Sequence, residues 1–332
     1  MHIPDNYLSP STCAVMGAVM VPVWLTAVAK LKKEITVKKI PLLGISAAFS
    51  FLVMMLNVPV PGGTTAHAVG SVLIALLLGP FSACITTSIA LLIQALFFGD
   101  GGILAFGANC FNMAFVMPFT GFYIFKFLCT IFKNDKAKYV AAFIGSYIAL
   151  NFAAFCAAIE FGIQPLLFKD SSGMPMYSPY PISVSIPAML IPHLLVGIIE
   201  GIITVGVYAY VQKLSPGIIY KEKESKALPL YLLILGLVVI SPLGLLAPGS
   251  AWGEWDLKEI EKLIKYIPSG MKNGFNFSAL FPDYNLPVLK NETIGYIISA
   301  ILGAAVLIII FKIVAGILKK RYEVKDNNAK NK

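Results

Sequence analysis

Long apolar runs separated by short polar loops dominate the pattern along this 332-residue chain. A helix needs about 20 consecutive apolar residues to cross the hydrocarbon core of a bilayer. Such runs predict spans at Ser11–Leu31, Ile40–Asn57, Ile103–Phe132, Tyr139–Gln164, Ile186–Val211, Leu230–Leu246 and Ile294–Leu318. The pattern therefore predicts an all-α polytopic membrane protein, with a bundle of about seven helices followed by two extra C-terminal transmembrane helices.

One further stretch, Thr65–Phe98, is continuously apolar but is divided by Gly79-Pro80. Because proline disrupts the interior of a helix, we expect two helices here, of which the first can be short. The predicted number of spans is then nine. The composition agrees with this class, since 58% of residues are hydrophobic and only 13% are charged, far from the averages of soluble proteins.

The distribution of charge indicates how the chain is oriented. Nine spans place the termini on opposite sides, and an outward N-terminus puts 20 of the 26 Lys and Arg residues in cytoplasmic segments. That asymmetry is what the positive-inside rule describes. We therefore expect a multi-pass protein of the cell membrane with an extracytoplasmic N-terminus and a cytoplasmic C-terminus. The net charge of +9 then reflects topology and does not indicate nucleic-acid binding.

The spacing of the spans divides the chain into two regions. Residues 1–212 hold closely spaced spans, residues 213–229 form a cationic cytoplasmic linker, and residues 230–332 hold two spans around an outward loop, 248–292. In that loop the segment Glu254–Ile267 repeats its apolar residues at helical spacing. It predicts an amphipathic helix at the membrane surface or over the outer face.

Signatures of soluble enzymes are absent from the sequence. Without a G-x-x-x-x-G-K-[ST] phosphate loop we expect any ATP hydrolysis on separate subunits, and neither H-E-x-x-H nor G-x-S-x-G is present. The stretch GDGGILAFG follows no strand and gives little support to phosphate binding. The five cysteines lie in apolar runs outside metal-ligand spacings, which is typical of buried thiols. We expect a protein that is not an enzyme and has no organic cofactor.

The N-terminus is unusual because it begins MHIPDNYLSP, without the cationic start of a signal peptide. The free amine of Met1, the amide of His2 and the His2 imidazole can close two fused chelate rings around one metal ion. Such nitrogen donors suit Ni(II) or Cu(II) in a square plane. The chelate requires that Met1 be retained, which we expect because the initiator methionine is normally removed only before small residues.

His67 is the candidate for a fourth metal ligand. It lies in MLNVPVPGGTTAHAVG, a loop that the predicted topology places on the same side as Met1 and His2. Taken alone, His67 is more typical of an interfacial or core histidine than of a ligand. Its pairing with an N-terminal Met-His favours the ligand interpretation.

Polar residues within the predicted spans are a second set of candidates, because ionisable groups are costly in a bilayer. His193 and Glu200 are seven residues apart and share a helix face, and Glu160 lies in the preceding span. They can bind a metal in transit, relay protons, or form a structural network between helices. Gln94 and Asn57, near the ends of spans, are candidates to support the metal ligands.

Four segments together resemble the CbiM/NikM family of substrate-specific membrane components of energy-coupling-factor cobalt and nickel importers. They are MHIPDNYLSP, MLNVPVPGGTTAHAVG, QALFFGDGGILAFGANCFNMAF and HLLVGIIEGIITVGV. The later ISPLGLLAPGSAWGEW resembles the fused module, related to the small N component, of longer family members.

The resemblance implies that four nitrogens hold Co(II) or Ni(II): the amine of Met1, the amide and imidazole of His2, and the imidazole of His67. It also implies that the N-terminal segment inserts into the bundle from outside. The partners would be a transmembrane coupling protein and cytoplasmic ATP-binding subunits. Ala14 and Ala18, a small-xxx-small pair on the first span, are candidates for docking that partner.

Three functions remain open on the sequence. The first is capture of cobalt or nickel for an ATP-driven importer, with weaker capture expected in acid because amine and imidazole must be deprotonated to bind. The second is a proton-coupled secondary transporter that uses His193, Glu160 and Glu200. The third, an intramembrane metal hydrolase, is disfavoured because no general base lies beside the histidines as it does in H-E-x-x-H. The choice between cobalt and nickel does not follow from these residues.

Overall fold

The computed structural model describes residues 1–330 except 35, 37, 38, 62, 135, 220–225, 248, 287 and 290. In this part of the chain the regular structure is helical apart from one short two-stranded ribbon. The first region contains α1 (Pro10–Glu34), α2 (Ile40–Met54), β1 (Val58–Val60), β2 (Thr64–Ala66), α3 (Ser71–Leu78), α4 (Pro80–Ile93), η2 (Gln94–Phe98), α5 (Phe106–Cys110), η3 (Phe111–Val116), α6 (Met117–Ile131), α7 (Ala137–Gly162), α8 (Gln164–Leu167) and α9 (Ile182–Leu214). The second contains η4 (Pro216–Ile218), α10 (Leu228–Ile240), η5 (Ser241–Leu246), α11 (Leu257–Ile264), α12 (Ser269–Lys272), η6 (Pro282–Tyr284) and α13 (Glu292–Lys330).

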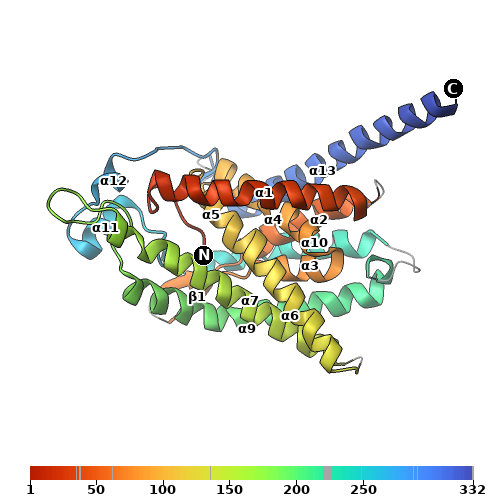
Figure 1. The fold of residues 1–332 in the computed structure, drawn as a ribbon, viewed down its shortest axis with the longest axis horizontal. Helices are drawn as coiled ribbons and strands as arrows, with labels where there is room; N and C mark the ends of the chain where they lie inside the picture. The colour runs from red at the N-terminus through yellow and green to blue at the C-terminus, as the bar shows by residue number, and fades with distance from the viewer. Residues whose placement is uncertain are drawn as a thin grey trace.

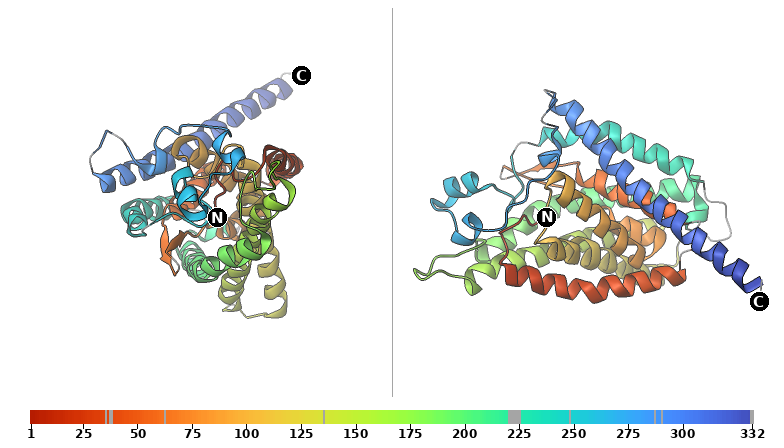
Figure 2. Two further views of the ribbon diagram at one scale, coloured as in Figure 1. Left: turned by 90° about the vertical axis from the view of Figure 1, so that its left-hand side faces the viewer. Right: turned by 90° about the horizontal axis from the view of Figure 1, so that it is seen from above.

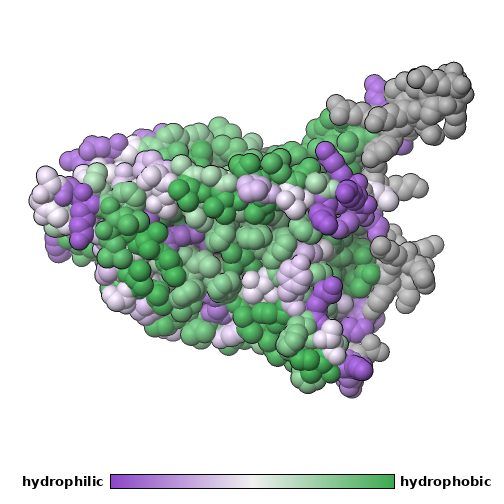
Figure 3. Space-filling view, viewed as in Figure 1, coloured by the Kyte–Doolittle hydropathy of each residue, from purple (hydrophilic) through white to green (hydrophobic). Residues whose placement is uncertain are grey.

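Seven helical segments of the described chain are long and apolar enough to cross a membrane. They are Pro10–Glu34, Pro80–Phe98, Phe106–Ile131, Ala137–Leu167, Ile182–Leu214, Leu228–Leu246 and Glu292–Lys320. Apolar side chains cover the middle of the molecule, and polar ones gather at its two ends (Figure 3). The predicted fold class is confirmed: this is an all-α, multi-pass membrane protein.

Seven of the nine predicted spans reach spanning length in the described chain, and the other two, α3 and α2, are shorter. Gly79-Pro80 does separate two helices as expected, but α3 has only eight residues. Eight residues extend about 12 Å at 1.5 Å each, against a hydrocarbon core of about 30 Å. The residues that a full helix would need form β2 and the extended, buried segment 67–70 instead. The other shortfall is α2, whose 15 residues also fall below spanning length.

Small residues allow the long helices of the bundle to approach closely. A side chain on Gly145 of α7 would come within 2.8 Å of the Gly121 carbonyl oxygen of α6, and one on Gly201 of α9 would meet the Phe143 ring of α7. Close helix contacts of this kind stabilise membrane bundles, because apolar side chains gain little by leaving lipid. The core that positions the site is therefore closely packed.

The two-span module packs on the bundle through α2, which contacts both α10 and α13 (Figures 1 and 2). Gly303 of α13 lies against the Phe51 ring, and the Tyr296 hydroxyl donates a hydrogen bond to the Met55 carbonyl oxygen at 2.6 Å. The helices on either side of the predicted linker end at Leu214 and begin at Leu228. Within that linker, residues 220–225 lie outside the described residues.

The amphipathic segment of the outward loop forms a helix shorter than predicted. A capping box begins α11, since Asp256 accepts a hydrogen bond from the Glu259 amide and the Glu259 carboxylate accepts one from the Asp256 amide. The helix ends at Lys265, whose φ is +66°. Ile260 is fully buried, so this helix packs against the protein through its apolar face.

Residues 1–9 form an irregular segment that enters the bundle. The N-terminus lies within the outline of the helices in both views of Figure 2. Met1, His2 and Ile3 are 2%, 1% and 0% exposed. The N-terminal segment is therefore inserted among the helices, and the side of the membrane from which it enters stays a prediction.

Candidate metal centre

The N-terminal segment is fastened to the bundle by an asparagine of α5. Asn109 accepts a hydrogen bond from the Ile3 amide at 2.8 Å and donates one to the Ile3 carbonyl oxygen at 3.0 Å. The amide of Gly102 donates to the same oxygen at 2.8 Å. Because Asn109 and Ile3 are both buried, these bonds fix the backbone beside His2 without competition from water.

The glycine-rich stretch between η2 and α5 is the surface on which the segment rests. The amides of Ile103 and Leu104 donate to the Asp5 carboxylate at 3.1 and 2.7 Å. A side chain at Gly102 would clash with Asp5, and one at Gly101 would meet the His2 ring. These glycines belong to the stretch GDGGILAFG, whose sequence did not indicate this structural role. They leave room for the N-terminal segment to pass close to the backbone.

The three candidate ligand residues lie close together and are buried in the protein. The Nε2 atom of His67 lies 3.1 Å from the Nδ1 atom of His2, and the two rings are 4.9 Å apart between centroids. His67 is 3% exposed, and its Nδ1 lies 3.0 Å from the carbonyl oxygen of Ala68. The structure thus brings together two residues separated by 65 positions.

Carboxylates surround the nitrogen atoms of this centre. The Met1 amine pairs with the Glu254 carboxylate at 3.2 Å, and His2 Nδ1 lies 3.1 Å from Asp100. Asp100 accepts hydrogen bonds from the Gln94 amide at 3.0 Å and from the Tyr284 hydroxyl at 2.5 Å. Glu254 and Tyr284 belong to the two-span module, and sequence reasoning missed both. No local pattern connects them to the N-terminus.

Burial keeps both histidine rings neutral over a wide pH range. Desolvation lowers the pKa of His2 to about 4, although the Glu254 charge and a side-chain hydrogen bond with Gln94 act in the opposite direction. Desolvation, followed by the positive charge of the Met1 amine, lowers the pKa of His67 well below its ordinary value. Burial raises the pKa of Asp100, against the hydrogen bonds from Tyr284 and Gln94. The rings therefore offer lone pairs at neutral pH.

A cavity of about 580 Å³ reaches this centre from outside. Its wall includes His67 from the bundle and also Asn57, one of the predicted supporting residues. The carboxylates that line it are Asp100, Glu254, Asp256, Glu259 and Asp283. No Lys or Arg belongs to the described residues of its wall, so the cavity attracts cations.

The predicted intramembrane residues are buried but make structural contacts. Glu200 accepts hydrogen bonds from the amides of Val69 and Gly70 at 2.8 and 3.1 Å, which holds the loop that follows His67. Glu160 accepts one from Asn112 at 2.8 Å. His193 Nδ1 lies 2.6 Å from the carbonyl oxygen of Met189 in the same helix. No contact joins Glu160 to the metal centre among the described hydrogen bonds.

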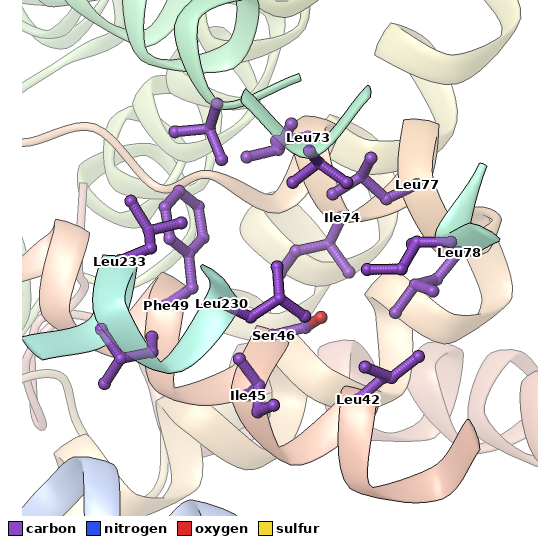
Figure 4. Close-up of a pocket in the computed structure, with 14 residues that line it drawn as sticks. Leu42, Ile45, Ser46, Phe49, Leu73, Ile74, Leu77, Leu78, Leu230 and Leu233 are labelled. Atoms are coloured by element: carbon purple, nitrogen blue, oxygen red, sulfur yellow. The ribbon is translucent and has the colours of Figure 1, made fainter. Parts of the chain in front are cut away.

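Two further features of the structure are the surface of α1 and a second, smaller cavity. Ala14 and Ala18, the candidate docking pair, are exposed on α1. A smaller cavity of about 40 Å³ lies between α2, α3 and α10 and is lined by apolar side chains and Ser46 (Figure 4), which leaves it without metal ligands. No group of three or more His, Cys, Asp or Glu side chains in the described chain is arranged to hold a metal.

The fold is that of a multi-pass membrane protein with a buried cluster of nitrogen atoms at its N-terminus. Residues 2–218 match the family described as "Cobalt uptake substrate-specific transmembrane region". The chain belongs to this family, CbiM, as the sequence motifs predicted. Residues 226–320 match the PDGLE domain, so the two-span module is a second family unit joined to the first.

Relatives share this combination along most of their length. The probable fused nickel transport protein LarMN of Lactiplantibacillus plantarum is 46% identical, covering 94% of this chain and 97% of that protein. The fused nickel transport protein NikMN of Rhodobacter capsulatus is 43% identical, covering 93% of this chain and 95% of that protein. A crystal structure described as a transition metal transporter is 51% identical over 67% of this chain and 97% of that one, with a TM-score of 0.62.

Proposed function

We propose that this protein captures Ni(II) or Co(II) outside the cell membrane as the substrate component of an energy-coupling-factor importer. The metal is held by the Met1 amine, the His2 amide, His2 Nδ1 and His67 Nε2. The observation that carries the proposal is the 3.1 Å separation of the two imidazole nitrogens, in a buried site at the end of an acidic cavity.

The separation fits adjacent corners of a square. In the chelate of Met1 and His2 the amide nitrogen stands between the amine and the imidazole, so the fourth ligand falls beside the imidazole. Two nitrogens bound at about 2.0–2.1 Å and at right angles are about 2.9 Å apart. His67 is therefore almost in place before the metal arrives, which lowers the cost of ordering the site.

The remainder of the importer follows from what the chain lacks and what it exposes. ATP hydrolysis belongs to separate cytoplasmic subunits, because the sequence has no phosphate loop. The exposed face of α1 with Ala14 and Ala18 is the proposed contact for the coupling protein. The outward N-terminus and inward C-terminus rest on the distribution of Lys and Arg, and the PDGLE match supports an N-type component fused in cis.

The test is a calorimetric titration of the purified chain with Ni(II) and Co(II), beside a variant with one alanine inserted between Met1 and His2. The insertion preserves every side chain but changes the chelate. We expect tight binding to the native chain and its loss, or an altered spectrum, in the variant. Identical binding by both would refute the ligand set. Uptake that follows the proton gradient rather than ATP would favour a secondary transporter using His193, Glu160 and Glu200.

A further inference from the structure

Two buried polar atoms beside the metal centre have no hydrogen-bond partner: His2 Nε2 and Gln94 Oε1. The side chains of His2 and Gln94 are 1% and 0% exposed, so water does not replace the missing partner freely. Buried polar atoms are nearly always paired, and an exception calls for a physical reason. The two atoms have complementary chemistry, because a ring nitrogen can donate and an amide oxygen can only accept.

The Gln94 amide is held in one orientation. Its nitrogen donates to the Asp100 carboxylate at 3.0 Å and to the Tyr284 hydroxyl at 2.8 Å, which uses both amide hydrogens. The hydroxyl of Tyr284 in turn donates to Asp100. Asp100 contacts the Gln94 amide nitrogen through Oδ2 and His2 Nδ1 through Oδ1. Gln94 therefore lies beside the imidazole, with its Oε1 left to accept a hydrogen.

Without metal, the ring proton of His2 belongs on Nδ1. His67 donates its Nδ1 hydrogen to the carbonyl oxygen of Ala68 at 3.0 Å, so its Nε2 carries a lone pair. That lone pair and an Asp100 oxygen both lie 3.1 Å from His2 Nδ1. Because both of these atoms accept hydrogen bonds, His2 Nδ1 carries the ring hydrogen. In a neutral ring the Nε2 atom then has no hydrogen.

Metal binding requires the opposite tautomer, because His2 Nδ1 must present its lone pair. We propose that Gln94 is a positioning residue that accepts the Nε2 hydrogen of His2 in the metal-bound state and so selects the tautomer that binds metal. This inference rests on the proposed function and deepens it. Ligating histidines commonly donate their second ring hydrogen to such a partner. The π-helix η2, which begins at Gln94, is a type of distortion often found at functional sites.

The protons balance in this step. One proton leaves His2 Nδ1 and one arrives at His2 Nε2, so the ring stays neutral and releases none overall. The two protons displaced by the metal come from the Met1 ammonium group and the His2 amide. Tyr284, on the two-span module, sets the orientation of Gln94 and so connects that module to the ligand.

The experiment follows the ring nitrogens by NMR of the full chain, labelled with ¹⁵N-histidine, before and after loading with Ni(II). Square-planar Ni(II) is diamagnetic and keeps the lines sharp. The chain has three histidines, and His67 and His193 each direct Nδ1 at a carbonyl oxygen. We expect three Nδ1-protonated rings without metal, and one ring protonated on Nε2, with slow hydrogen exchange, once nickel is bound.

Variants separate the positioning role from a merely structural one. Gln94→Met has a similar size but no acceptor, so we expect about 10- to 100-fold weaker nickel binding and fast exchange of the Nε2 hydrogen. Tyr284→Phe should change both readouts in the same direction by a smaller amount. Tyr296→Phe is the matched control, because its hydroxyl bonds to Met55 and no described hydrogen bond joins it to Gln94 or Asp100. Its ring packs against Tyr284 and lines the same cavity, and the substitution keeps that ring. It should behave as the native chain does.

The outcomes distinguish the two proposals. Native affinity and slow exchange in both Gln94→Met and Tyr284→Phe would overturn the role of Gln94 and leave the metal site intact. If Gln94→Met fails to fold, a difference between Tyr284→Phe and Tyr296→Phe supports the role, and equal behaviour of those two overturns it. A native chain that binds no nickel, or binds it without any change at His2, would overturn the proposed function itself.

Discussion

Two asparagines connect the N-terminal segment to the rest of the protein, one to the bundle and one to the module. Each makes two hydrogen bonds with a backbone, but the two sites differ in burial. Asn109 of the bundle makes two hydrogen bonds with the backbone of Ile3. Asn6 of the segment makes two with the backbone of Phe275 in the outward loop of the module, at 2.7 and 2.9 Å. The first pair is buried, and the second is exposed to water.

We call the buried contact at Asn109 the anchor of the segment and the exposed contact at Asn6 its closure, because the two differ in the cost of breaking them. A hydrogen bond in a desolvated site costs its full solvation penalty when it is broken, whereas an exposed one is replaced by water. The bundle therefore sets the position of His2. The module contacts the segment through the exposed Asn6 bonds, which open at low cost. It also makes two partly buried contacts, the Tyr7 hydroxyl on the Trp255 carbonyl oxygen and the ion pair between Met1 and Glu254.

The largest effect should follow from breaking the buried anchor. Asn109→Leu keeps the volume but leaves the amide and carbonyl groups of Ile3 buried with fewer partners. We expect a loss of about 2–4 kcal/mol in the free energy of unfolding and at least about 10-fold weaker nickel binding. Thermal unfolding in detergent and calorimetry measure the two effects. Native values for both would show that the bundle does not hold the segment.

The second-largest effect should be a loss of stability in acid, caused by protonation of the buried His2 ring. The folded-state pKa of His2 is about 4, below its ordinary 6.5, so the unfolded chain binds more protons between these values and stability falls as the pH drops from 6.5 to 4. The slope is about 1.4 kcal/mol per pH unit for one such histidine at most. His2→Gln should flatten the unfolding curve of the metal-free protein in this window. An unchanged slope would contradict the burial of a neutral ring.

Loss of the closure at Asn6 should lower the free energy of unfolding less than loss of the anchor does. Asn6 has a φ of +69°, which glycine adopts freely, so Asn6→Gly removes the two hydrogen bonds without adding strain. We expect less than about 1 kcal/mol of lost stability. Comparison with Asn109→Leu in the same unfolding assay is the control. Equal losses from the two variants would remove the distinction between anchor and closure.

The charge of the module should have the smallest effect, on rate rather than affinity. Asp283 lines the acidic cavity, so Asp283→Asn weakens the attraction of a divalent cation. We expect stopped-flow association of Ni(II) to slow by about two- to threefold at low ionic strength and to match the native rate at high salt. Glu261→Gln, an exposed position of α11 outside the cavity wall, is the matched control. The same slowing there would indicate a general charge effect.

The sequence by itself determined the features that have a local or covalent signal. The apolar runs gave the membrane class, the break at Gly79-Pro80 followed from backbone chemistry, and the order of Met1 and His2 defined the chelate that we propose. The motifs were sufficient to predict the family, which the matches confirmed. Hydropathy allowed a short helix at α3 but did not predict β2 or the short α2, because a buried strand, a short helix and a full span can have the same apolar composition.

The tertiary structure alone decided what surrounds the ligands. Glu254 meets Met1 from 253 positions away, Tyr284 meets Gln94 from 190, and Asn109 meets Ile3 from 106. No periodicity or spacing encodes such pairs, because each depends on how the helices pack around the N-terminal segment. The sequence therefore determined which atoms can bind a metal, and the fold decided which neighbours hold those atoms, shield them from water and set their protons.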